Sequence, residues 1–162
     1  MSTRTREYFP AFLNLLAAVF VMLISFSGYF KFHIEWFNVK LTGIIVVYAG
    51  MGICIWSTIY LKGAITDMVL PRFDYLVKNG PYNYCRHPIY LGITIAFIGL
   101  ALALRSWMGL ISVLLVFLPR EIHRAKLEEK MLSEKFGDEW LQYKNNTCFL
   151  IPGIKRKQQS KN

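Results

Sequence analysis

Cysteine is scarce in this chain of 162 residues, which contains Cys54, Cys85 and Cys148 at wide intervals. Three scattered cysteines exclude a disulfide framework and a zinc site with the usual ligand spacing. A dinucleotide-binding glycine fingerprint is also missing, because Gly50 and Gly52 have no third glycine at the required spacing. Aromatic residues do not alternate with the basic ones, as a base-stacking surface requires. We therefore expect no metal site, no Rossmann cofactor domain and no nucleic-acid partner.

Charge is absent from two long stretches, residues 11–30 and 41–61. Each is long enough, as a helix, to cross a bilayer core of about 30 Å. Two further apolar runs, 89–104 and 107–118, are separated by Arg105 and Ser106 alone, which predicts an antiparallel helical hairpin. The fold predicted is an all-α, polytopic membrane protein, a single domain over residues 1–162. Its four transmembrane helices span about 11–30, 41–61, 89–104 and 107–120.

The basic residues are distributed unevenly around these spans. With the four predicted helices, one side of the bilayer carries sixteen of the nineteen Lys and Arg residues, and the other side carries Lys31, Lys40 and Arg105. Because basic loops stay in the cytoplasm, both termini are predicted to be cytoplasmic. Arg4 and Arg6 precede the first apolar stretch, and no small-residue cleavage site follows it, so we expect this stretch to remain as an anchor.

Two polar segments lie on the predicted cytoplasmic side. The loop 62–88 is long enough to be functional rather than merely connecting. The tail 121–162 begins as an amphipathic helix from Arg120 to about Lys144, and Phe136-Gly137 ends its first part. Apolar residues recur at helical spacing in this helix, at Ile122, Leu127, Met131 and Leu132.

Two clusters hold the residues capable of chemistry. The first is residues 80–92, in which Arg86 and His87 precede Pro88 at the mouth of a helix, where free backbone N–H groups gather. As single residues they also suit an interfacial turn facing lipid headgroups. The second is residues 120–129, in which Arg124 and Glu128 lie four apart on one helix face. The simplest interpretation of that pair is a surface ion pair worth a few tenths of a kcal/mol. An ionisable pair at a membrane boundary is also a functional candidate.

Taken together, the two clusters resemble the integral membrane methyltransferases of the isoprenylcysteine carboxyl methyltransferase superfamily, which includes related phospholipid methyltransferases. The resemblance covers roughly half of the chain, residues 74–152, with a helical hairpin between its halves. The ordered set that carries it is Leu76-Val77, Gly80, Tyr82, Arg86-His87-Pro88, Tyr90, Gly92, Arg124, Glu128-Glu129, Leu132, Phe136-Gly137, Trp140, Tyr143 and Ile151-Pro152.

The resemblance implies that S-adenosylmethionine is the cofactor, held by the loop before the hairpin and by the first turn after it. The cofactor positions that it implies are Asp74, Tyr75, Leu76, Val77, Tyr82, His87, Pro88, Ile89, Tyr90 and Glu128. Arg124 falls at the family's substrate-side arginine, so Arg124 and Glu128 are the implied catalytic residues. Prenylcysteine enzymes often carry His at the first of these positions; Asp74 here leaves a side-chain or a backbone contact open.

The function implied is an S-adenosylmethionine-dependent methyltransferase in a membrane, with lipids around it and a lipophilic acceptor. A carboxylate such as that of a prenylated cysteine is favoured, because it is already ionised and Arg124 can orient it. A phospholipid amine, a small thiol or another acid is the alternative. An amine must lose a proton, which would give Glu129 or His123 a role. A protein of another class, a membrane scaffold or transporter subunit, would share the helices without binding the cofactor.

Overall fold

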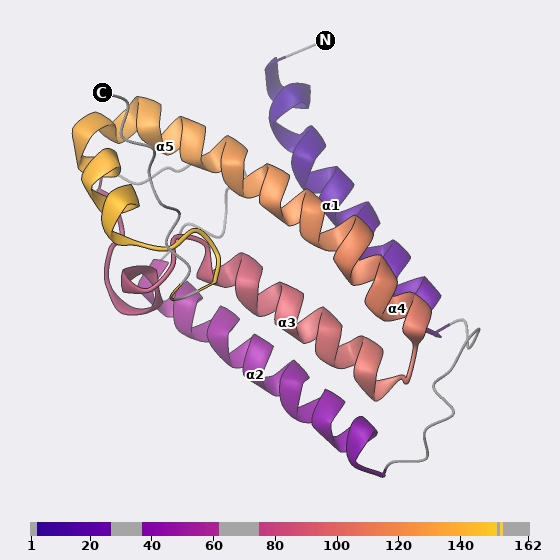
Figure 1. Ribbon diagram of the computed structural model, residues 1–162. Coiled ribbons are helices and arrows are strands. Elements are labelled where there is room, and N and C mark those ends of the chain that lie inside the picture. The colour runs from indigo at the N-terminus through magenta and orange to yellow at the C-terminus, as the bar shows by residue number, and fades with distance from the viewer. Residues whose placement is uncertain (1–2, 27–36, 62–74, 152, 154–162) are drawn as a thin grey trace, which may run out of the picture.

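The computed structural model describes residues 3–26, 37–61, 75–151 and 153, with side chains from residue 12 onward except that of Phe37. Within these residues the protein is helical, with α1 (Thr3–Phe26), α2 (Phe37–Leu61), η2 (Gly80–Asn83), α3 (Pro88–Ala103), α4 (Trp107–Ser112), the π-helical η3 (Val113–Phe117) and α5 (Leu118–Asn146). No strand occurs in this described part of the chain, which confirms the predicted all-α class. The long helices lie side by side along one direction (Figure 1).

Glycines allow α2 and α3 to pack closely. Gly50 and Gly99 each face the backbone of the opposite helix, and an added Cβ would lie 2.5 Å from Ala96 N and from Val47 N respectively. Gly43 and Gly92 repeat the arrangement one heptad away. Small residues at such an interface let two helix backbones approach, as in membrane helix pairs. This packing fixes the position of α3, whose first turn belongs to the first chemical cluster.

The other side of α3 packs on a small core formed by α1 and the hairpin's second arm. Val21 and Val113 are fully buried, and Phe117 is buried with its ring 4.7 Å from that of Phe97 in α3. The hairpin turns at Arg105, which has a φ of 54°, and Ser106 then caps the next helix by accepting a hydrogen bond from Gly109 N. The predicted hairpin is confirmed, with a connection of three residues, Leu104–Ser106, where two were predicted.

The predicted fourth span and the predicted tail helix are not separated in the structure. Helix continues without a break from Trp107 through η3 into α5, because the i to i+5 turns of η3 join the two parts. The predicted interruption at Gly137 is confirmed, since this residue has φ 50° and ψ −120°, a conformation suited to glycine. After it, α5 turns back toward the start of α3 (Figure 1).

The described helices differ in their ability to cross a bilayer. Asn38–Leu61 is long and apolar enough, with a mean hydropathy of 2.0. The apolar parts Phe12–Phe26 and Pro88–Ala103 are shorter. The 16 residues of α3 extend about 24 Å, less than the roughly 30 Å of a bilayer core. Lys31, Arg4, Arg6 and the basic residues after Gly153, on which the predicted topology depends, lie outside the described side chains.

Candidate active site

The first cluster is shaped by a short 3-10 turn that leads into α3. Gly80 has a φ of 62°, and an added Cβ would lie 2.8 Å from the ring of Tyr60 in α2, so glycine meets both demands. His87 precedes the helix and Pro88 takes its first position, where a missing N–H is no loss. Both are buried. The turn therefore points Arg86, His87 and Tyr90 toward the neighbouring α5.

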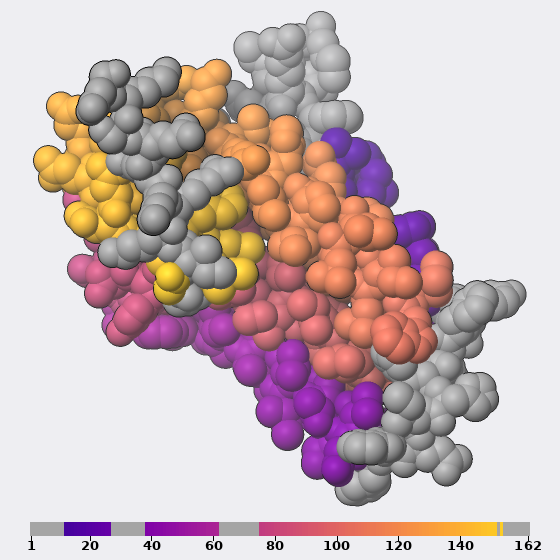
Figure 2. All heavy atoms as spheres, viewed as in Figure 1, coloured from indigo at the N-terminus to yellow at the C-terminus, as the bar shows by residue number. Residues whose placement is uncertain are grey.

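Arg86 joins three segments that are far apart in the sequence. Its Nε lies 2.6 Å from Glu129 Oε1 in α5, and both side chains are about nine-tenths buried. Its Nη1 donates hydrogen bonds to the carbonyls of Lys144 and Thr147, at the end of α5. The neighbouring Cys85 forms an isolated β-bridge with Cys148, and both thiols are free. Arg86 thus holds the end of α5 against the turn. The two segments, yellow and pink, lie next to each other in Figure 2.

Glu129 is a charged residue in a buried place. Burial alone would raise the pKa of its carboxyl, but the neighbouring His87 and the hydrogen-bonded, charged Arg86 lower the pKa to about 2. Lys144 Nζ lies 3.2 Å from its second oxygen. A carboxylate held in this way is a weak base, so Glu129 does not suit the proton-accepting role that an amine acceptor would require.

His87 lies between the two adjacent glutamates of α5. Its Nε2 is 3.6 Å from Glu129 Oε1, and its Nδ1 is 3.8 Å from Glu128 Oε2. The ring stacks on Tyr90, with centroids 5.5 Å apart, and meets Phe149 edge-on at 5.2 Å. Nε2 is buried and has no hydrogen-bond partner within normal distance. The imidazole ring is therefore positioned mainly by its aromatic contacts with Tyr90 and Phe149.

Tyr90 connects the first cluster to the second. Its hydroxyl donates a 2.9 Å hydrogen bond to Glu128 Oε2, and the guanidinium of Arg124 lies 5.4 Å from its ring centroid. Glu128 keeps 37% of its side chain exposed, in contrast to the buried Glu129. The two clusters that the sequence singles out, about forty residues apart, are therefore brought into direct contact. This contact forms a candidate site at the start of α3.

The remaining residues predicted for the site differ in burial and in their contacts. Tyr82 is buried, and burial together with the charge of Glu128 raises the pKa of its hydroxyl above the ordinary value. The carbonyl of Ile89 accepts a hydrogen bond from the Cys54 thiol. Leu76 and Val77 are half-buried, whereas Tyr75 is 62% exposed. Asp74 lies outside the described residues.

Several contacts of the site were not predicted from the sequence. Arg86 and Glu129 were noticed as parts of a motif, but their pairing joins positions 43 residues apart, which no local pattern reveals. Tyr143 donates a hydrogen bond to the Tyr82 carbonyl. Asn14 donates to Glu121. A polar residue within an apolar span was a usable signal for Asn14.

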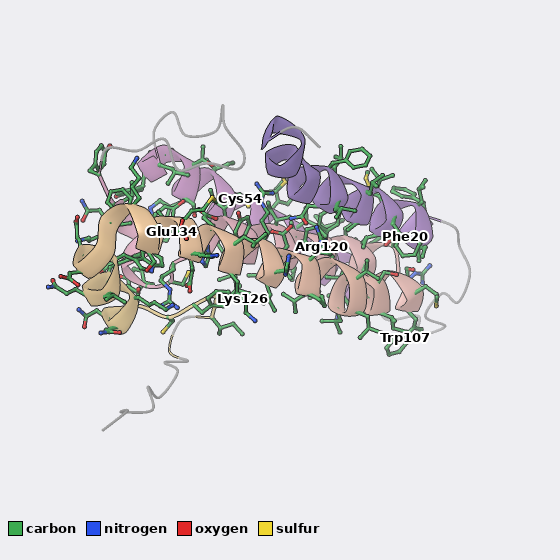
Figure 3. All side chains as sticks on the ribbon, turned by 90° about the horizontal axis from the view of Figure 1, so that it is seen from above. Phe20, Cys54, Trp107, Arg120, Lys126 and Glu134 are labelled. Carbon is green, nitrogen blue, oxygen red and sulfur yellow. The ribbon has the colours of Figure 1, made fainter. Side chains whose placement is uncertain are left out.

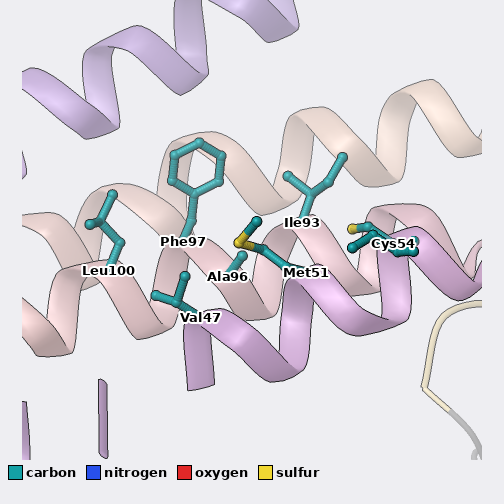
Figure 4. A pocket seen from close by; sticks show the side chains of 8 residues that line it. Val47, Met51, Cys54, Ile93, Ala96, Phe97 and Leu100 are labelled. Carbon is teal, nitrogen blue, oxygen red and sulfur yellow. The ribbon is translucent and has the colours of Figure 1, made fainter. Parts of the chain in front are cut away.

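An apolar groove runs beside the site between α2 and α3. It has a volume of about 300 Å³ and is lined without polar surface by Val47, Met51, Cys54, Ile55, Ile93, Ala96, Phe97 and Leu100 (Figure 4). Cys54, at one end, reaches the carbonyl of Ile89, the residue before Tyr90. Ile93 and Leu100 lie seven residues apart on α3, about 10 Å along the helix. The groove thus extends from the candidate site along the hydrophobic part of the molecule.

Comparison with known proteins adds a family and several relatives. The family model described as phospholipid methyltransferase matches residues 39–139, more than half of the chain. Protein-S-isoprenylcysteine O-methyltransferase from Saccharomyces cerevisiae is 39% identical over 79 residues, 49% of this chain and 33% of that protein. Methanethiol S-methyltransferase 1 from Bradyrhizobium diazoefficiens is 37% identical over 71 residues, 44% of this chain and 24% of that one. A steroid 5-alpha-reductase from Solanum lycopersicum is 27% identical over 148 residues, 86% of this chain and 56% of the relative. The chain spans only part of the length of each of these relatives.

Proposed function

The chain belongs to the phospholipid methyltransferase family, and from this premise we propose that it is a membrane enzyme that methylates a lipophilic acceptor with S-adenosylmethionine. The observation that carries the proposal is the contact of Tyr90 with both Glu128 and Arg124. It joins the residues proposed to hold the cofactor to the residue proposed to hold the acceptor. Residues 1–162 then act as one catalytic domain.

Glu128 is the residue best suited to a cationic cofactor. S-adenosylmethionine supplies, when bound, a methyl group on a positively charged sulfur. Glu128 offers a partly exposed carboxylate, whereas the oxygens of Glu129 are already engaged by Arg86 and Lys144. Tyr90 fixes Glu128 through the 2.9 Å hydrogen bond, and the ring of Tyr90 adds an aromatic face. Together with His87, Pro88, Ile89 and Tyr82, these groups form the proposed cofactor site. The predicted set is completed by Asp74, Tyr75, Leu76 and Val77.

Arg124 is proposed to bind the acceptor, and its charge favours an anionic one. It lies one helical turn before Glu128 on the inward face of α5 and packs over Tyr90. A guanidinium can hold a carboxylate by two parallel hydrogen bonds. Methyl transfer to a carboxylate is an in-line displacement that needs alignment but no general base. The low pKa of Glu129 agrees with this chemistry, and a prenylated-cysteine carboxylate is therefore the favoured acceptor.

The apolar groove between α2 and α3 supports a lipophilic acceptor. Its lining is wholly apolar, and its Cys54 end lies beside Ile89 at the proposed site. A hydrocarbon chain in this groove would leave its polar end near Tyr90 and Arg124. Burial of such a chain contributes about 0.8 kcal/mol for each methylene group.

A multi-pass membrane location with both termini in the cytoplasm completes the proposal. The window of α2 that could span a bilayer is only 11% buried within the protein, so its apolar side chains need lipid around them. Exposed apolar side chains continue on the hairpin, with Leu115 at 72% exposure. Phe20 and Trp107 lie at one end of the molecule, and Glu134 lies at the other (Figure 3). The part of α5 around Glu134 is rich in charged residues. The charged end would face the cytosol, from which a polar cofactor arrives.

Calorimetry of the purified chain with S-adenosylhomocysteine tests the cofactor site. We expect binding by the wild type and at least tenfold weaker binding by Glu128→Ala, because a charged partner is lost from a partly desolvated site. Glu134→Ala, which removes an exposed carboxylate from the same helix, is the matched control and should bind normally. Wild-type protein that binds no ligand at millimolar concentration would instead indicate a scaffold or transporter subunit.

Methyl incorporation into three acceptors tests the substrate class: a farnesylcysteine analogue, phosphatidylethanolamine and methanethiol. We expect the farnesylcysteine analogue to be labelled. Arg124→Ala should cut its turnover about a hundredfold while leaving cofactor affinity nearly intact. An equal loss of both would contradict the division of roles between Arg124 and Glu128. Labelling of one of the other two acceptors alone would retain the methyltransferase and replace the proposed acceptor.

A further inference from the structure

A polar contact joins α1 to α5 one helical turn before Arg124. Asn14 Nδ2 donates a 2.8 Å hydrogen bond to Glu121 Oε1, across 107 residues of sequence. Asn14 is 6% exposed and Glu121 4% exposed. Glu121 lies just beyond the predicted span 107–120, where the hairpin leaves the hydrophobic part of the molecule. The contact therefore sits between the first helix and the helix that carries the candidate site.

The same two side chains leave two buried acceptors without donors. Glu121 Oε2 and Asn14 Oδ1 are both inaccessible to water, and neither has a hydrogen-bond partner. A buried acceptor without a donor costs about 1–3 kcal/mol, and more if it is charged. A proton on the carboxyl group resolves this, since it turns one acceptor into a donor and removes the charge. An amide and a neutral acid can then exchange hydrogen bonds in both directions.

The surroundings of Glu121 permit the neutral form. Burial raises the pKa of Glu121 to about 7, against the lowering effects of Arg124 and Arg120 and with a smaller raising effect of Glu128. From α3, Tyr90 interacts electrostatically with Glu121. The described side chains of α1, residues 12–26, contain no charged group. In contrast to Glu129, Glu121 has an amide as its hydrogen-bonding partner.

We propose that Glu121 carries a proton and pairs with Asn14 as a neutral acid, forming a latch that holds α1 against the segment of α5 that bears Arg124 and Glu128. Asn14 and Glu121 belong to neither the proposed cofactor set nor the proposed acceptor site, so the proposal assigns them a positioning role. Ionisation of Glu121 would place a buried carboxylate beside the unpaired Asn14 oxygen and loosen the latch. This inference does not depend on methyl transfer and would stand if the proposed reaction were wrong.

Infrared spectroscopy of the full chain in detergent micelles tests the protonation directly. We expect the absorption of a protonated carboxyl group at pH 6, its loss as the pH rises through about 7, and its absence in Glu121→Gln. The matched control is Glu134→Gln, whose exposed side chain should leave the absorption unchanged. A wild-type spectrum without this absorption at pH 6, or one that Glu121→Gln does not alter, would overturn the proposal.

The folded-to-unfolded ratio of the same variants tests the latch. Glutamine keeps the shape and the donor of a protonated glutamate, so Glu121→Gln should lie within about twofold of the wild type at pH 4, where the carboxyl is protonated in the folded and largely in the unfolded chain. Glu121→Ala and Asn14→Ala should each lower the ratio about five- to hundredfold, because each leaves a buried polar partner unsatisfied. As the pH rises from 4.5 through 7, the wild type should lose stability relative to Glu121→Gln. A Glu121→Gln variant as unstable as Glu121→Ala would contradict a neutral acid. If single variants fail to fold, Asn14→Leu combined with Glu121→Leu removes both partners and should fold throughout this pH range.

Discussion

Glu121 and Glu129 lie eight residues apart on the same buried face of α5, about 12 Å along the helix. Glu129 contacts Arg86 and Lys144, whereas Glu121 accepts a hydrogen bond from the uncharged Asn14. The pKa of Glu129 is lowered to about 2, and the pKa of Glu121 is raised by burial to about 7. The pKa of the same residue type on the same helix face is thus lowered in one place and raised in the other, and the partner from another segment decides the direction.

The comparison also separates two kinds of structural role. Glu129 fastens the end of α5 to the turn before α3, so it supports the geometry of His87 and Tyr90. Glu121 fastens α1, all of which lies outside the region matched by the family, residues 39–139. Breaking the charged contact leaves an uncompensated buried charge, whereas breaking the neutral one leaves an unpaired dipole. Loss of the Glu129 contact should therefore lower the free energy of unfolding more than loss of the Glu121 contact.

The largest effect is expected for Glu129→Ala. It leaves the guanidinium of Arg86 buried without a counter-charge, so the free energy of unfolding should fall by about 3–5 kcal/mol. Unfolding in detergent micelles measures this value. Glu134→Ala removes a carboxylate from an exposed pair with Lys130 and should change it by less than about 0.5 kcal/mol. Similar values for the two variants would show that the Arg86 contact contributes little.

A pH series sharpens the comparison through the opposite signs of the two glutamates. Because the folded-state pKa of Glu129 lies below its ordinary value of 4.5, its contribution is complete above pH 4.5 and is lost as the pH falls toward 2. The stability difference between wild type and Glu129→Gln should therefore shrink over that range. Glu121 has a raised pKa, so its contribution should decline as the pH rises from 4.5 through 7. A difference that stays constant below pH 4.5 would contradict the charged state of Glu129.

Tyr90→Phe tests whether Glu128, like the two buried glutamates, depends on a hydrogen bond from another segment. The change removes the 2.9 Å hydrogen bond but keeps the aromatic ring under Arg124. We expect a loss of about 1 kcal/mol in stability, and several-fold weaker binding of S-adenosylhomocysteine because Glu128 is no longer fixed. Phe136→Leu, elsewhere on α5, is a control for a changed aromatic residue. Unchanged ligand affinity in Tyr90→Phe would remove the phenol from the proposed site.

The smallest effect is expected for Lys144→Ala. Its ammonium lies 3.2 Å from Glu129 Oε2, but the side chain is 40% exposed and water screens the contact. Removing it should cost about 0–1 kcal/mol, since Arg86 keeps the main contact with Glu129. The measurement is the same unfolding experiment. A loss as large as that of Glu129→Ala would mean that Lys144, rather than Arg86, compensates the buried carboxylate.

Local features of the site were readable from the sequence because they depend on neighbouring residues. Pro88 at the first position of α3 and the break at Gly137 follow from backbone rules that need no tertiary information. The likeness to a methyltransferase family likewise rested on an ordered motif. The sequence predicted helix on both sides of Arg120 but did not show that α4, η3 and α5 form one run, because the change from apolar to charged residues there does not interrupt backbone hydrogen bonding.

By itself, the sequence determined the helical class, the apolar stretches, the hairpin turn and the residue types available for chemistry, since periodicity and backbone preference are local properties. Tertiary structure alone decided that Arg86 pairs with Glu129, that Tyr90 joins Glu128 to Arg124, and that Asn14 meets Glu121. The physical reason is that the charge of a buried carboxyl depends on which dipoles and cations surround it. Those groups come from segments that only the packing of the helices brings together.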